Sequence, residues 1–165
     1  MTASPANEDP DALGVVQGLL QQGEVTKALE TLDGLADTAK SSAMGQYMRG
    51  VCLRLTRDFA NAESALRQLV DSNPSYGRGF QELGHLYRDA NMPIEALNAY
   101  ATACHLNPGL KASWAAQRDL IGKSSPERTA QIDQRLQWLE SLPPVLFASW
   151  DLLHEGKLHK AEQLC

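Results

Sequence analysis

The apolar residues of this chain recur every three or four positions, which is the spacing of one face of an α-helix. In the clearest segment, Phe80, Leu83 and Tyr87 fall on one side of a helix expected over residues 76–90. No run alternates in the way that predicts a strand. We therefore expect an all-α chain, with the remaining helices over residues 10–22, 25–38, 41–57, 59–71, 92–106, 111–121 and 126–141 and a further hairpin over 144–165.

Turn residues group these helices into hairpins. Asn91 is expected to end the helix over 76–90, and Pro93 can stand in the first turn of the next helix, where a backbone N–H is not needed. Asn107 is disfavoured in a helix because Pro108 follows it. A single hairpin of this kind cannot bury its apolar face alone, so neighbouring hairpins must pack against it.

The hairpins repeat with a period of 34 residues. Ala28, Ala62 and Ala96 share this spacing, and so do two glycines and two prolines at positions 50 and 84 and at 74 and 108. Ala130 continues the series, although the apolar residues around it are displaced. The period predicts a flexible tail at residues 1–9, then repeats over about 9–42, 43–76 and 77–110, a distorted one over 111–142 and a truncated one over 143–165.

One segment, from Gly77 to Pro108, carries a recognisable motif. Its spacing of a large residue, Leu-Gly, an aromatic residue, Ala and a second aromatic residue resembles that of a tetratricopeptide repeat, a helix-turn-helix unit of 34 residues; the residues are Phe80, Leu83, Gly84, Tyr87, Ala96 and Tyr100. The resemblance implies a right-handed superhelix (α-solenoid) of antiparallel helix pairs, forming a single domain over residues 10–165.

Composition narrows the choice of partner. The chain has 15 basic and 20 acidic residues, a net charge of −5 and a pI near 5.3, which disfavours a general nucleic-acid or anionic-membrane surface. No apolar run approaches the roughly 20 residues that span a bilayer. The first residues lack the pattern of a signal peptide, and Cys52 and Cys104 fall on apolar helix faces, where a reduced thiol packs as a small hydrophobe. We expect a cytoplasmic protein.

The sequence offers no catalytic motif. It lacks a Gly-rich phosphate loop, an HExxH pair and a Gly-x-Ser-x-Gly turn, so we expect no enzyme activity, no cofactor and no metal. His154 and His159 lie in one expected hairpin near Glu155 and Glu162. An exposed hairpin surface is a simpler interpretation of them than a metal site.

The resemblance implies that the first helix of each repeat lines a concave groove. Arg54, Arg78 and Arg88 would form a positive strip there, suited to a protein or peptide partner with an acidic element and an apolar anchor. The alternative is that these positions are ordinary surface or are covered by other parts of a longer protein. The expected groove residues are Tyr47, Val51, Arg54, Arg78, Gln81, His85, Arg88 and Asp119.

Some members of the family bind a terminal carboxylate with two Lys, two Asn and an Arg. At the matching positions this chain has Leu13, Gln17, Met48, Arg78 and Glu82, so only Arg78 keeps the required charge. We therefore expect that the chain is not a receptor for terminal carboxylates.

Two further hypotheses concern the last two dozen residues. The stretch 142–165 resembles the corresponding part of bacterial tetratricopeptide proteins with a C-terminal sulfotransferase domain, which implies that the chain is the targeting or substrate-presenting arm of such an enzyme, cut from a longer protein. Alternatively, the helix over 157–165 ends without a polar closing unit, and Leu158 and Leu164 would join two copies into a homodimer.

Overall fold

The computed structural model describes residues 12–154, with the backbone alone at positions 151 and 154. Within this range the regular elements are all helical, which confirms the expected all-α class. The chain divides into two compact units, residues 1–71 and residues 72–165. The single domain over 10–165 stays a prediction, and the expected tail at 1–9 lies outside the described residues.

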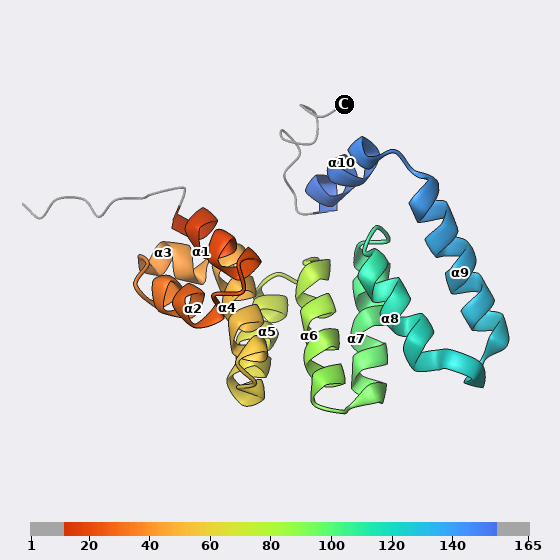
Figure 1. The fold of residues 1–165 in the computed structure, drawn as a ribbon, viewed down its shortest axis with the longest axis horizontal. Helices are drawn as coiled ribbons and strands as arrows, with labels where there is room; N and C mark the ends of the chain where they lie inside the picture. The colour runs from red at the N-terminus through yellow and green to blue at the C-terminus, as the bar shows by residue number, and fades with distance from the viewer. Residues whose placement is uncertain (1–11, 155–165) are drawn as a thin grey trace, which may run out of the picture. The chain divides into compact units, whose positions relative to one another are not determined.

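The first unit holds five helices, coloured red to yellow in Figure 1. They are α1 (Ala12–Gln21), α2 (Val25–Asp33), α3 (Asp37–Ser41), α4 (Ala43–Leu55) and α5 (Phe59–Ser72). Its core contains Val16 of α1, Ala28 and Leu32 of α2, and Met48 and Cys52 of α4, each at most 3% exposed. The periodic apolar positions of three helices thus meet in one cluster.

The helix expected over 25–38 is wrong in its second half. Helix α2 ends at Asp33 and a separate short helix, α3, follows. Gly34 caps α2, and glycine disfavours a helix interior by about 1 kcal/mol relative to alanine. The break leaves Leu35 in the connection, where it packs against the core cluster of the first unit. Ser42 then caps α4, and its hydroxyl accepts a hydrogen bond from the N–H of Gly45 at 3.0 Å.

The second unit begins with the hairpin that carries the clearest motif. The described elements of the second unit are α6 (Gly77–Asp89), α7 (Pro93–Leu106), α8 (Lys111–Ile121), the 3-10 turn η1 (Gly122–Ser124), α9 (Pro126–Ser141) and α10 (Pro144–His154). The hairpin with the motif consists of α6 and α7. Figure 1 shows α6 and α7 as adjacent antiparallel helices joined by a tight turn.

Glycines allow the paired helices to approach closely. A Cβ atom added to Gly84 would lie 2.6 Å from the ring of Tyr100, whose side chain is fully buried. In the first unit Gly50 faces Leu66 in the same way. Leu66 and Tyr100 are 34 residues apart, so each fills the space above the glycine of its own hairpin. This contact explains the spacing of the glycines.

The turns of the first three hairpins share one backbone structure. Gly23, Arg57 and Asn91 have positive φ angles of 77°, 65° and 59°. The residue after each turn donates a backbone hydrogen bond to a carbonyl five positions earlier, as in a Schellman cap; the pairs are Glu24 to Leu19, Asp58 to Leu53 and Met92 to Tyr87, at 2.9, 2.9 and 2.7 Å. The 34-residue period therefore extends to individual hydrogen bonds.

The fourth hairpin departs from this geometry. Pro126 stands where the period places the donor of the capping bond, and proline has no N–H. The chain instead reverses through Gly122 at φ 50° and the turn η1. Arg118 and Gln134 occupy the places of Gly84 and Tyr100, so the close glycine contact is replaced by larger side chains.

The core positions of α9 are shifted, as the sequence indicated. Ile132 and Leu139 are buried, whereas Trp138 is 42% exposed. Ala130 is also exposed, so its spacing of 34 from Ala96 does not place it in a core. The expectation that Ala130 continues the series in the fourth repeat is therefore corrected: the sequence spacing is kept, but the residue is not buried. The expected last helix, over 157–165, lies outside the described residues.

Candidate functional site

The expected groove residues of the second unit lie on α6 and α8, and one hydrogen bond connects these two helices. The hydroxyl of Ser113 on α8 donates a hydrogen bond of 3.0 Å to the Oε1 atom of Gln81 on α6. Ser113 is fully buried and Gln81 is half-buried. The first helices of these two repeats are thus linked by a hydrogen bond, and Gln81 is engaged in that link.

His85 is also engaged in the packing of its own hairpin. Its Nδ1 atom lies 2.6 Å from the hydroxyl of Tyr100, and the two rings meet edge to face with their centroids 5.3 Å apart. The buried phenol thereby gains a polar partner at the surface of the hairpin. The ring of His85 is half-buried, so a ligand on this face would contact its remaining edge.

Charged positions provide the more accessible part of this face. Arg88 is exposed, with its Nε atom 4.0 Å from Asp89, and Asp119 is exposed and pairs with Arg118 at 3.2 Å. Arg118 also approaches Asp133 at 3.5 Å. Arg78 is half-buried near the start of α6. The face therefore carries both signs of charge.

The groove residues of the first unit all lie on α4. Tyr47 packs against the core cluster of that unit, and Val51 and Arg54 are half-buried. These residues belong to the first compact unit, so a groove that joins them to those of α6 and α8 stays a prediction. Two positions of the terminal-carboxylate motif, Met48 and Glu82, are buried at 3% and 5% exposure.

The second unit also contains a hollow that the sequence did not reveal. It has a volume of about 590 Å³ and lies among α7, α8 and α9. Its polar lining includes Arg128, Arg135 and His105, and its apolar lining includes Trp114 and Ile132. Arg128 and Arg135 are seven residues apart, which places them on one face of a helix. This spacing could be read from the sequence, but it does not indicate that a hollow lies beside the two arginines.

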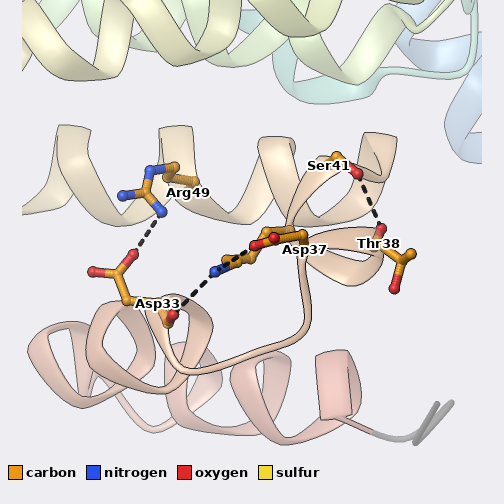
Figure 2. Close-up of polar contacts among 6 residues, drawn as sticks. Asp33, Asp37, Thr38, Ser41 and Arg49 are labelled. Atoms are coloured by element: carbon orange, nitrogen blue, oxygen red, sulfur yellow. Dashed lines mark hydrogen bonds and ion pairs between the residues drawn. The ribbon is translucent and has the colours of Figure 1, made fainter. Parts of the chain in front are cut away.

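A smaller hollow in the first unit has a different electrostatic character. It measures about 290 Å³ and is lined in part by Lys40, Arg49 and Asp37. Lys40 pairs with Asp37 at 3.0 Å and Arg49 pairs with Asp33 at 2.6 Å. Figure 2 shows Arg49 directed at Asp33 across the space between two helices. Both cations of this hollow are thus neutralised within the unit.

The two described thiols are poor nucleophiles. Burial raises the pKa of Cys52 to about 11 and that of Cys104 to about 12, from an ordinary value of 9.0. Both are free and buried, as the sequence indicated, and the side-chain amide of Gln117 lies 3.1 Å from the sulfur of Cys104. At neutral pH both thiols stay protonated, which disfavours thiolate chemistry. Among the described residues no three His, Cys, Asp or Glu side chains are grouped to hold a metal ion.

Solved structures support the assignment of the fold. A crystal structure of MamA matches with a TM-score of 0.68 at 19% identity, covering 82% of this chain and 80% of the other. A double mutant, MamA RS-1 ArsTM, matches at 0.66 and 18% identity, covering 82% and 76%. MamA residues 41 to the end from Desulfovibrio magneticus RS-1 match at 0.63 and 16% identity, covering 83% and 76%. The chain has a tetratricopeptide-type fold.

No protein-family model and no curated protein matches the chain. No helix in the described part of the chain combines the length and apolar character needed to cross a bilayer. The cytoplasmic location stays a prediction. So does the resemblance to tetratricopeptide sulfotransferases, because residues 155–165, which carry nearly half of it, lie outside the described range.

Proposed function

We propose that this chain is a non-catalytic scaffold that binds a protein or peptide on the face formed by the first helices of its repeats. The observation that carries the proposal is the hydrogen bond between the side chains of Ser113 on α8 and Gln81 on α6, which connects the two helices. Stacked repeats build extended surfaces of this kind, and these surfaces bind partners in helical-repeat proteins. The tetratricopeptide-type fold supports the same interpretation.

The chemistry of the face favours a partner with an acidic element. Arg88 is exposed near the end of α6, and Arg78 is half-buried near the start of the same helix. Asp119 on α8 adds a negative group. An extended or helical peptide with mixed charge and an apolar anchor would complement these groups.

The test is capture of a partner from the native lysate with the purified chain, followed by charge reversal. Arg88→Glu should reduce capture about tenfold, since it turns an attraction into a repulsion at the contact. Arg54→Glu tests whether the face extends to α4 of the first unit. Lys123→Glu in η1 is the control, because this exposed lysine lies in the connection between α8 and α9. Equal loss of capture in the control and in Arg88→Glu would contradict the proposal.

Self-association is a second candidate, and one observation favours it. Helix α10 leaves Val145, Leu146 and Leu153 46%, 46% and 50% exposed. If two copies associate through this end, sedimentation should show concentration-dependent dimers that Leu146→Glu abolishes. The expected roles of Leu158 and Leu164 can be tested by the same substitutions. A chain that is monomeric at all concentrations would overturn the idea.

A further inference from the structure

The hollow among α7, α8 and α9 differs in charge from the molecule as a whole. Its ten lining residues include two arginines and one histidine but neither Asp nor Glu, in a chain with a net charge of −5. A volume of about 590 Å³ is within the range of ligand pockets, roughly 300–1,000 Å³. Local positive charge in an acidic protein is a feature that attracts an anionic partner.

The two arginines of the hollow have no carboxylate partner among the described residues. Asp133 of α9 pairs instead with Arg118 of α8, at 3.5 Å. The cations of the smaller hollow in the first unit, by contrast, are each paired with an aspartate. The charge of Arg128 and Arg135 is therefore available to a ligand.

Aromatic rings hold one of these arginines in place. The guanidinium of Arg135 lies 5.8 Å from the ring centroid of Trp114 and 4.9 Å from that of Trp138. Trp114 is itself anchored, because its indole N–H donates a hydrogen bond of 2.9 Å to the carbonyl of Pro108. Contacts with ring faces fix a guanidinium without using its in-plane N–H donors, which suits the recognition of carboxylates.

The spacing of the arginines fits an extended peptide. Seven residues of α-helix separate Arg128 from Arg135, which is about 10 Å along the axis at 1.5 Å per residue. An extended chain in the polyproline II conformation has three residues per turn and advances about 3.1 Å per residue, so two acidic side chains three positions apart lie on the same side, about 9 Å apart. Ile132 and Trp114 lie in the same lining and offer apolar contact to a residue between the acidic ones.

From these observations we infer that this hollow binds an extended acidic peptide segment of another protein, with two carboxylates three residues apart. The site lies apart from the α6 and α8 positions of the proposed function and involves different residues. It adds a second contact to that function, yet its failure would leave the α6–α8 face untouched.

The test is fluorescence anisotropy with a labelled peptide Ser-Gly-Glu-Val-Gly-Glu-Gly-Ser and the full chain. Binding should weaken about tenfold in each of Arg128→Gln and Arg135→Gln, because each removes one charge-assisted contact. It should also weaken as salt increases from about 0.05 to 0.5 M. The control variant is Lys27→Gln on α2, which removes an exposed positive charge of the first unit and should bind as the unaltered chain does. Circular dichroism of each variant verifies that it is folded.

Further peptides decide the specificity. The same peptide with both Glu replaced by Gln should not bind, and one in which the two Glu are adjacent should bind more weakly. Equal binding of the Gln peptide, or undiminished binding by the exposed-site variant Arg128→Gln, would overturn the inference. So would a loss of binding in Arg88→Gln, since that result would place the peptide on the α6 face. No binding of the Glu peptide at millimolar concentration would also overturn it.

Discussion

The α6–α7 hairpin and the α8–α9 hairpin have related sequences at a spacing of 34 but different packing. In the first, Gly84 admits the ring of Tyr100 and a Schellman cap closes the turn. In the second, Arg118 and Gln134 stand at these positions, and Pro126 removes the donor of the cap. The regular hairpin is closed by a buried aromatic ring, whereas the irregular one leaves a hollow lined with arginines.

The comparison shows how a repeat can gain a binding surface by losing a packing contact. A glycine under an aromatic ring fixes two helices at close range and leaves no space between them. Once larger polar residues replace this pair, the second helix no longer follows the register of the earlier repeats. Its charged face then borders a space that neighbouring helices do not fill.

The largest expected effect comes from removing the ring that closes the regular hairpin. Tyr100→Ala should lower the free energy of unfolding by about 3–5 kcal/mol, because it leaves a cavity in a fully buried site. Urea denaturation followed by circular dichroism measures this loss. Gln134→Ala, at the equivalent exposed position of the fourth hairpin, should change it by at most about 0.5 kcal/mol. Similar losses in both variants would show that the hairpins do not differ.

The second effect concerns the glycine beneath that ring. Gly84→Ala should destabilise the chain by about 1–3 kcal/mol, because the new methyl group would meet Tyr100 at 2.6 Å. Gly18→Ala is the matched control, since this helical glycine has no neighbour within 4 Å of the added atom and alanine is the better helix former. Gly18→Ala should therefore raise the free energy of unfolding. If Gly84→Ala also raises it, the close packing of Gly84 against Tyr100 is contradicted.

A smaller effect tests the turn of the irregular hairpin. Gly122 has φ 50° and ψ −132°, a backbone conformation that L-residues avoid. Gly122→Ala should cost about 1–2 kcal/mol even though space for the methyl group is open. Lys123→Ala in the same turn serves as the control and should be nearly neutral in thermal unfolding. An unchanged midpoint for Gly122→Ala would show that this turn has a different conformation.

The smallest effect concerns the thiols buried in regular hairpins. Burial raises the pKa of Cys104 from 9.0 to about 12, so the unfolded chain loses this proton at lower pH than the folded one. The stability that this shift contributes is complete below pH 9 and is lost as the pH rises toward 12. Stability should therefore fall above pH 9, with a slope of at most about 1.4 kcal/mol per pH unit for each thiol. The slope should be shallower in Cys104→Ala, and an identical slope would contradict the shift.

Much of the fold could be predicted from sequence because its determinants are local. The helices over 111–121 and 126–141 were expected with the observed bounds, since a proline or a glycine marks their ends. The second helix was extended past Gly34, because the apolar pattern continued through Leu35. That leucine packs against the core from a turn instead of a helix, and periodicity alone does not distinguish the two cases.

The candidate site was less predictable. Gln81 and His85 had the spacing of groove residues, yet their side chains contact Ser113 and Tyr100. Helical spacing gives the face of a residue, but the rotamer and the partner depend on the neighbouring helix. For the same reason, spacing could place Arg128 and Arg135 on one side of α9 without revealing that a hollow lies beside them.

The sequence by itself determined the helical class, the 34-residue period and the spacing of the glycines, because each depends on residue types at fixed spacings. Tertiary structure decided which of the residues spaced 34 apart are buried in a core. Ala96 is fully buried whereas Ala130 is exposed, although the same spacing predicts both. Burial depends on how two helices pack, and the fourth hairpin lacks a backbone donor in its turn and has an arginine in place of the glycine.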